Sequence, residues 1–368
     1  MIRLSSVIES FETDFLAQYR HRLTSDHYRA LAAMKQCRTQ ASPMMQVRCT
    51  GCAQQKLVPH SCGHRHCPHC QHHESQQWLE RQLKKQVPAE YFLLTFTLPA
   101  EFRGLAGAHQ GVVYDLLMRC AWETVRIFSQ NDRQLRGTPG AIAVLHTNTR
   151  QLEYHPHVHL VMPAAAVDGQ RRLWRTKRRK GKGGYLFNHK ALAKVFRGKL
   201  LAAIEAAGLT LPGSYPTEWV VDCKSVGSGE KALIYLGRYL YRGVIAEKDI
   251  VAVDKGQVCF RYRNGKAGKM ERRTVSGAHF LWLVLQHVLP KGFRRARNFG
   301  FLHPNCKRLI ALLHLLLRFD PGRALAWVKE RAPILCACCG AVMVIVRTRI
   351  RSGLSGGMPA PIVTGKTH

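Results

Sequence analysis

A short stretch of alternating residues, His155–Met162, limits most strongly how this chain can fold. Successive side chains of a β-strand point to opposite faces, so His157 and His159 lie on one side and the apolar residues between them lie on the other. A histidine pair on one face of an apolar strand is typical of a metal site. Two histidines with ordinary structural roles would give the same pattern, so other features of the sequence must decide.

The composition favours a polyanionic partner. The 368 residues include 56 lysines and arginines against 23 aspartates and glutamates, which gives a net charge of +33. This excess suits nucleic acid far better than an acidic metabolite. No apolar run reaches the roughly 18 residues that a membrane span needs. Acidic residues in the first apolar stretch, Glu9, Glu12 and Asp14, argue against a signal peptide, so we expect a cytoplasmic protein without membrane contact.

The cysteine pattern predicts zinc. Thirteen cysteines in a reducing cytoplasm favour metal thiolates over disulfides. Two Cys-x-x-Cys pairs, Cys49 with Cys52 and Cys67 with Cys70, are fourteen residues apart, close to the spacing of a four-thiolate zinc site. The loop between them has too few apolar residues to fold without the ion.

Other possible ligands stay open at this point. Cys62, His60 and His66 could replace one zinc ligand or hold a second ion. A later group contains Cys336, Cys338 and Cys339 and has no visible partner pair, so we expect free thiols or a site completed elsewhere in the chain.

A third histidine is expected beside the pair. The apolar run before the histidine strand ends on His146, and a hairpin would lay this residue next to His157 and His159. Three neutral imidazoles leave a divalent cation with its full charge and with open positions for a phosphate oxygen. His155 shares the strand face and remains an alternative third ligand.

Two tyrosines are predicted to lie near this site. A helix beginning near residue 230 places Tyr235 and Tyr239 on one face, one turn apart. Arg238 and Arg242 form a neighbouring row that can hold phosphates. Tyrosines at helical spacing are core packing more often than nucleophiles, so the pair suggests catalysis only together with the histidines.

Five motifs occur in the order seen in one family. They are the cysteine region, His146-Thr147, His155-Pro-His-Val-His159, Tyr235-Leu-Gly-Arg-Tyr239 and His287-Val-Leu-Pro-Lys-Gly-Phe293. From about Cys49 to His303 the chain resembles the rolling-circle transposases of the insertion sequence 91 family, within the wider class of histidine-hydrophobic-histidine (HUH) endonucleases.

The resemblance implies an enzyme that nicks and rejoins single-stranded DNA at mobile-element ends, in a prokaryotic cytoplasm near the nucleoid. It implies that His157 and His159 bind a catalytic metal, that Tyr235 and Tyr239 are the nucleophiles, and that the cysteine region is a zinc domain that helps to bind DNA. We expect Mg²⁺ or Mn²⁺ at the histidines, His146 included, and a 5′-phosphotyrosine intermediate. Two alternatives remain, a zinc-containing DNA-binding protein without activity, and a relaxase or replication initiator with the same chemistry.

Basic residues elsewhere are expected to contact DNA, with Trp174 placed to stack on a base. The full set of expected contacts is Arg171, Arg172, Trp174, Arg175, Lys177, Arg178, Arg179, Arg238, Arg242, Lys291, Arg294 and Arg295.

We expect an α+β fold, with flanking helices around an antiparallel HUH-like sheet, preceded by a small helical and zinc-binding domain. The expected divisions are residues 1–88 for the N-terminal helices and zinc domain, 89–300 for the catalytic domain, 301–350 for a C-terminal helical region and 351–368 for a disordered tail.

Overall fold

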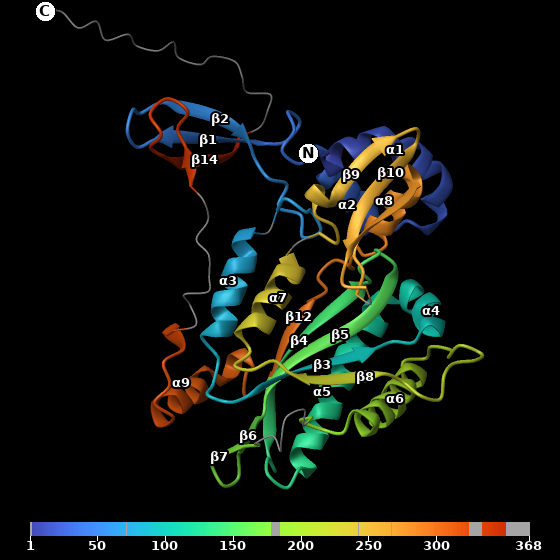
Figure 1. Ribbon diagram of the computed structural model, residues 1–368, viewed down its shortest axis with the longest axis vertical. Coiled ribbons are helices and arrows are strands. Elements are labelled where there is room, and N and C mark those ends of the chain that lie inside the picture. The colour runs from blue at the N-terminus through green and yellow to red at the C-terminus, as the bar shows by residue number, and fades with distance from the viewer. Residues whose placement is uncertain are drawn as a thin grey trace, which may run out of the picture.

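The computed structural model describes residues 2–70, 72–177, 185–241, 243–265, 267–323 and 333–350. It confirms the α+β fold: helices are combined with antiparallel sheets (Figure 1). The expected tail at 351–368 lies outside the described residues. Among the helices of the described ranges, none combines the length and the apolar character that a membrane crossing requires.

The largest sheet has seven strands in the order β7-β6-β4-β5-β3-β8, with β12 paired to β4, and each pairing is antiparallel. Its strands are β3 (Tyr91–Thr97), β4 (Thr138–Asn148), β5 (Tyr154–Pro163), β6 (Ala165–Asp168), β7 (Leu173–Thr176), β8 (Val221–Ser225) and β12 (Ala296–Gly300).

Helices cover both faces of this sheet (Figure 1). On one face α5 (Gln110–Asn131) and α6 (His189–Ala206) pack over Val158 and Leu160 of β5. On the other face α3 (His72–Leu83), α7 (Glu230–Tyr241) and α9 (Lys307–Leu316) share a core with Val161. Because side chains alternate along β5, the predicted histidine pair points to the face covered by α7.

A second unit surrounds the N-terminal helices. α1 (Leu4–Tyr19) and α2 (Ser25–Gln36) share a buried core with α8 (Gly277–Leu285). A three-stranded sheet adjoins them, with β9 (Ile250–Asp254), β10 (Gln257–Arg263) and β11 (Met270–Ser276). The expected catalytic division, 89–300, therefore contains a segment that packs with the N-terminal helices, because Val258, Phe260 and Phe280 bury their side chains there.

The C-terminal part differs from the prediction. Residues 301–350 were expected to be helical, but among the described residues of this range only α9 is an α-helix, and the last described elements are strands β13 (Ile334–Leu335) and β14 (Val342–Ile350). They form a four-stranded sheet, β13-β14-β1-β2, with β1 (Met44–Cys49) and β2 (Gln55–Pro59) (Figure 1). In the described ranges, the remaining short helices are α4 (Arg103–Ala108) and the 3₁₀ turns Arg20–Arg22, Ala100–Phe102, Glu247–Asp249 and Pro304–Cys306.

Candidate active site

Three histidines meet on the α7 side of the large sheet. β4 and β5 pair so that His146 lies opposite His157, and Val144 lies opposite His159. The three histidines each offer a ring nitrogen, and these nitrogens lie within 4.8 Å of one another. The structure thus brings together the three predicted histidines, through the hairpin that the sequence suggested.

The ring contacts leave nitrogen atoms free to bind a metal. Thr95 Oγ1 lies 3.0 Å from His159 Nδ1, and the His155 carbonyl lies 2.7 Å from His157 Nδ1. Both contacts leave Nε2 available on the other side of each ring. His146 Nε2 is buried and has no hydrogen-bond partner among the described residues. A buried imidazole nitrogen without a partner fits the metal site that the sequence predicted.

Burial keeps these histidines neutral, which is the form that binds metals. Burial lowers the pKa of His157 to about 4 and that of His159 to about 3. The pKa of His146 is also held well below its usual value, chiefly by burial and then by the neighbouring histidines His159 and His157. Three lone pairs are therefore available near pH 7.

His155 lies on the same strand face but has another partner. Its Nδ1 lies 3.1 Å from Arg103 Nη2, and it is absent from the group of three whose ligand atoms converge. The geometry therefore favours His146 over His155 as the third residue of the group.

α7 carries the two tyrosines to this site. The Tyr239 ring stacks on the His146 ring, with centroids 3.3 Å apart and planes 5° from parallel. The Tyr235 ring lies 6.1 Å from that of His146 and 6.2 Å from that of His159. Tyr235 is 51% exposed, and partial burial together with nearby Tyr239 raises its pKa above the usual value.

Three residues that the sequence did not assign to this site contact Tyr239. The Tyr239 hydroxyl donates a hydrogen bond to Asn148 Oδ1 and accepts one from the Thr147 backbone N–H at 3.3 Å. The guanidinium of Arg295 lies 4.5 Å from the ring centroid of Tyr239. Asn148 comes two positions after His146 on the same strand, so the period of two could have identified it. No comparable sequence signal identifies Arg295.

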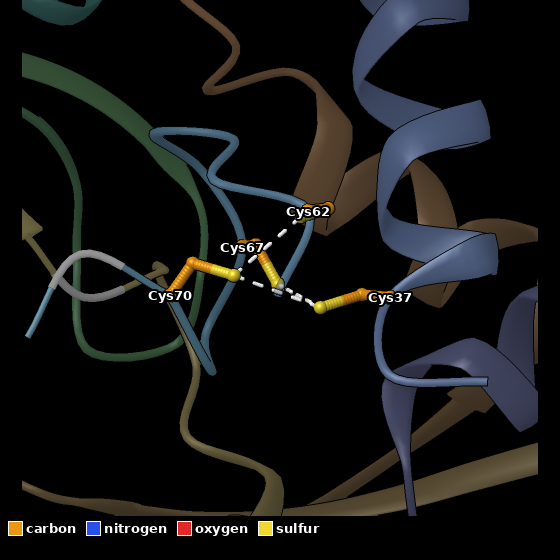
Figure 2. Close-up of side chains that lie close together, drawn as sticks. All are labelled: Cys37, Cys62, Cys67 and Cys70. Atoms are coloured by element: carbon orange, nitrogen blue, oxygen red, sulfur yellow. Dashed lines mark hydrogen bonds between the residues drawn. The ribbon is translucent and has the colours of Figure 1, made fainter. Parts of the chain in front are cut away.

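The cysteines divide into two clusters, and the predicted grouping is wrong. Cys67 and Cys70 lie with Cys62 and with Cys37, which follows α2 (Figure 2). Their sulfurs are close: Cys37 is 3.5 Å from Cys67 and 3.6 Å from Cys70, and Cys62 is 3.6 Å from Cys70. We call these four residues the first cysteine cluster.

The other predicted pair lies beside cysteines from the C-terminal part of the chain. Cys49 and Cys52 lie with Cys336 and Cys339, the second cysteine cluster, while Cys338 stays outside it. The prediction failed because every pair has similar short spacing, so local sequence does not specify its partner. Of the three open alternatives, only Cys62 joins a cluster.

The two histidines in that region have other partners. His66 Nε2 accepts a hydrogen bond from the Leu289 N–H at 3.1 Å, and His60 Nδ1 lies 2.7 Å from the Ser61 carbonyl oxygen. Neither histidine belongs to a group of converging ligand atoms in the described ranges.

Several predicted DNA contacts are occupied within the protein. Lys177 donates to Asp132 at 2.5 Å and to the Leu186 carbonyl at 2.8 Å. Trp174 packs edge-on against Phe301, which leaves it less free to stack on a base than predicted. These two residues therefore depart from the expectation of open surface contacts.

The arginines in the same prediction have different environments. Arg175 pairs with Asp168 at 3.4 Å. Arg295 is only 7% exposed and donates to the Leu145 carbonyl at 3.0 Å, so little of its side chain is accessible for the predicted DNA contact. Five of the predicted contacts are exposed: Arg171, Arg172, Arg238, Lys291 and Arg294. Arg178, Arg179 and Arg242 lie outside the described residues.

A basic groove that the sequence did not predict lies between α3, β12 and α9. It has a volume of about 1180 Å³. The cations that line it are Arg81, Lys84, Lys85, Arg294, Arg297 and Lys307. Its acidic residue, Asp115, pairs with Arg297 at 2.6 Å. Burial lowers the pKa of Lys85, and its positive neighbours Lys307 and Arg81 lower it further. The groove is thus suited to an anionic ligand.

Comparisons with known proteins find similarity to transposases. The sequence profile of the family described as "Putative transposase" matches residues 140–309, and that of the "Transposase zinc-binding domain" matches residues 7–98. A relative named "Putative transposase y4qJ", from Sinorhizobium fredii, is 32% identical over 303 residues, covering 76% of this chain and 75% of the relative. The transposase for insertion sequence element IS801, from Pseudomonas savastanoi pv. phaseolicola, is 28% identical over 338 residues, covering 83% and 78%.

Proposed function

The chain belongs to the insertion sequence 91 family of transposases, and from this premise we propose that it nicks and rejoins single-stranded DNA at the ends of a mobile element. Membership of this family makes it a DNA-processing enzyme of transposition. The observation that carries the finer proposal is the stack of Tyr239 on His146, which brings a hydroxyl nucleophile to the edge of the histidine group. Such an enzyme works where the chromosome lies, in a prokaryotic cytoplasm near the nucleoid.

The proposed metal site is the group of His146, His157 and His159. A divalent ion held there would act as a Lewis acid and stabilise the negative charge that develops on the scissile phosphate. We propose Mn²⁺ or Mg²⁺. Imidazole nitrogens suit Mn²⁺ better than Mg²⁺, because Mg²⁺ prefers oxygen ligands in an octahedral arrangement.

The residues of the chain carry the covalent chemistry. The oxygen of Tyr235 or Tyr239 attacks the phosphorus in line, the hydroxyl proton leaves to solvent, and a bond from this oxygen to phosphorus forms. The bond from phosphorus to the 3′-oxygen breaks. That oxygen keeps the bonding electrons and takes up a proton, giving a free 3′-hydroxyl and a 5′-phosphotyrosine. Attack by another 3′-hydroxyl reverses the step and joins two strands, and two tyrosines allow two cleaved ends to be held together.

The N-terminal region supplies structural zinc sites. It is a transposase zinc-binding domain, and we place its zinc in the first cysteine cluster, Cys37, Cys62, Cys67 and Cys70. Cys37, Cys67 and Cys70 are buried in the core that joins α1, α2 and α8. The ion would therefore stabilise this whole unit.

The basic groove offers a path for the DNA strand. Its cations outnumber its acidic residues, so phosphates would replace the counterions that such a surface attracts. Arg294 lines the groove and is adjacent in sequence to Arg295, which contacts the Tyr239 ring. We propose that a single strand runs along the groove towards the histidine group.

Covalent trapping tests the proposed function. A labelled single strand with candidate element ends is incubated with the protein and Mn²⁺, and the products are separated under denaturing conditions. We expect a covalent adduct that Tyr235→Phe and Tyr239→Phe each reduce and that the double variant abolishes. Tyr185→Phe serves as the control, because Tyr185 is exposed beside α6 on the opposite face of the sheet.

Three outcomes would reject parts of the proposal. Adduct that persists in the Tyr235→Phe, Tyr239→Phe double variant would exclude these tyrosines as nucleophiles. Tight DNA binding without an adduct at any tested end, with or without Mn²⁺, would favour the alternative of a DNA-binding protein without activity. Nicking at a plasmid transfer or replication origin, rather than at element ends, would favour a relaxase or replication initiator.

A further inference from the structure

We propose that Cys49, Cys52, Cys336 and Cys339 bind a zinc ion of their own, and that this second site fastens the C-terminal strands to the N-terminal zinc domain. The family profile for the zinc-binding domain ends at residue 98, so it includes only half of this cluster. The inference concerns metal content and chain connection, and it holds whether or not the nicking reaction is as proposed.

The sulfur geometry fits one tetrahedral ion. Cys49 Sγ lies 3.4 Å from Cys339 Sγ, and Cys52 Sγ lies 3.7 Å from Cys336 Sγ. The four sulfurs lie within 4.8 Å of one another. A zinc–sulfur bond of about 2.3 Å puts the sulfurs of a tetrahedron about 3.8 Å apart. These separations are much longer than the roughly 2.05 Å of a disulfide bond.

The turn after β1, which contains Cys49 and Cys52, directs backbone N–H groups at a sulfur atom. Cys49 ends β1, and its Sγ accepts hydrogen bonds from the backbone N–H groups of Gly51 at 3.3 Å and Cys52 at 3.4 Å. N–H groups directed at sulfur stabilise the thiolate, which is the form that binds the metal. Gly51 is required by the close approach of the other turn. A Cβ there would lie 2.9 Å from Ala341 Cβ and 3.3 Å from Cys339 Sγ.

The turn between β13 and β14, which contains Cys336 and Cys339, is also held by backbone hydrogen bonds. The backbone N–H of Cys336 donates to the Ala341 carbonyl at 2.8 Å, and that of Gly340 donates to the Cys336 carbonyl at 2.9 Å. Gly340 has φ of +73°, which favours glycine. The turn between β13 and β14 therefore places Cys336 and Cys339 opposite the first pair.

The sheet around this cluster lacks an adequate core of its own. Its buried hydrophobic cluster consists of Val47 and Met343 with the two cysteines Cys49 and Cys336. Several apolar side chains of β14 are exposed instead, including Ile345. A small sheet with so little buried apolar surface usually needs a metal to fold.

The cluster also joins distant parts of the chain. β1 and β14 are antiparallel neighbours, and Cys49 lies opposite Met343 in their register. Cys49 and Cys339 are 290 positions apart in the sequence. An ion on all four sulfurs would close this long loop and keep β14 on β1, in addition to the hydrogen bonds between the strands.

Zinc content is the direct test. Full-length protein is loaded with zinc, freed of loosely bound metal and measured by elemental analysis. Every protein in this experiment carries His157→Ala, so that zinc bound by the histidine group does not add to the measured zinc content. We expect two zinc ions per chain, and one after Cys336→Ser with Cys339→Ser. Cys338→Ser is the matched control and should keep two ions, because Cys338 lies in the same turn but outside the cluster.

A spectroscopic measurement distinguishes the loss of the metal site from a general loss of folding. Cobalt bound to thiolates gives a charge-transfer absorption that cobalt on imidazole lacks. We expect the Cys336→Ser, Cys339→Ser variant to lose about half of this absorption while circular dichroism keeps the helical signal of the remaining fold. A single zinc ion in the parent protein, or two in the double variant, would overturn the second site.

A cleavage experiment tests the connection between the chain ends. A protease site is inserted between Arg323 and Pro333, and the cut protein is passed over a sizing column. We expect the fragment that carries β14 to stay bound with zinc present and to separate in the Cys336→Ser, Cys339→Ser variant. A fragment that separates from the zinc-loaded parent, or stays bound in the variant, would contradict the fastening role.

Discussion

At the residue scale, the two tyrosines of α7 have unequal environments. Tyr239 stacks on His146, and its hydroxyl is held by Asn148 and the Thr147 backbone. Tyr235 is half exposed and lies farther from the histidine rings. The structure therefore fixes the direction of one hydroxyl much more firmly than the other, and Asn148 becomes a positioning residue.

Loss of the Asn148 side chain should slow the reaction without weakening DNA binding. In Asn148→Ala the Tyr239 hydroxyl loses its acceptor, and a nucleophile misplaced by about 1 Å can cost up to about 100-fold in rate. We expect a single-turnover nicking rate at least about 10-fold lower, with unchanged affinity for the strand. The control is Asn188→Ala, which removes a helix cap from α6 on the opposite face. Equal rates in both variants would remove Asn148 from this role.

His287 should make stability depend on pH. Burial lowers its pKa to about 4, from an ordinary value of 6.5. Between these values the unfolded chain binds a proton that the folded chain does not, so stability is complete above pH 6.5 and is lost as the pH falls towards 4. From pH 7 to pH 5 this loss amounts to about 2 kcal/mol.

The measurement compares urea unfolding of the parent protein and His287→Gln at both pH values, with zinc present throughout. The zinc thiolates lose stability in acid equally in both proteins, so the difference between the two isolates His287. We expect the parent to lose more stability than His287→Gln. An identical loss in both would show that His287 is not buried in its neutral form.

The sequence could predict the convergence of the histidines but not the residues around them. Periods of two and 3.6 place His157 and Tyr239 on particular faces, and a hairpin brings His146 to the pair. Arg295, just before β12, contacts the Tyr239 ring, and the second cysteine cluster joins Cys49 to Cys339, 290 positions away. Such contacts depend on tertiary packing, which local periodicity does not contain.

At the element scale, the contact between α7 and α3 sets the position of the tyrosines. Gly237 of α7 lies between the two tyrosines in the sequence. A Cβ at this position would be 3.3 Å from the Trp78 ring of α3. Ser75 Oγ donates to the Gly237 carbonyl at 2.9 Å. The glycine thus permits a close approach of the two helices (Figure 1).

A larger side chain at this position should displace α7. Gly237→Val would overpack the contact with Trp78, at a cost of about 1–3 kcal/mol, and would move both tyrosines away from the histidines. We expect lower stability in urea and less covalent adduct. Gly198→Val in α6 is the matched control, since a Cβ there meets nothing within 4 Å. Normal adduct formation by Gly237→Val would show that α7 tolerates the shift.

Elements with strong periodicity could be predicted from the sequence. β5 (Tyr154–Pro163) and α7 (Glu230–Tyr241) occur close to their expected positions, because their residues alternate with the regular period of a strand and of a helix. The strands at 334–350 could not, because they bury little apolar surface and are held by pairing with β1.

At the scale of the whole molecule, the positive charge should make DNA binding strongly dependent on salt. Each phosphate contact adds about 0.7 to the slope of log affinity against log salt for a single strand. Lys84→Gln removes one exposed cation of the groove, so the slope should fall by about this amount. Lys190→Gln on α6 removes an equal charge from the opposite face and should leave the slope unchanged. Identical slopes for both variants would exclude the groove as the DNA path.

The pairing of β14 with β1 has a consequence for synthesis of the protein. β1 leaves the ribosome early, but its partner strand emerges only after almost the whole described chain has been translated. Until then one edge of β1 has no strand to pair with, and such edges recruit other chains. A polypeptide that terminates before Cys336 would keep this edge permanently open. We therefore expect prematurely terminated chains to be removed by proteolysis or to aggregate, so that only nearly complete translation products accumulate as soluble protein.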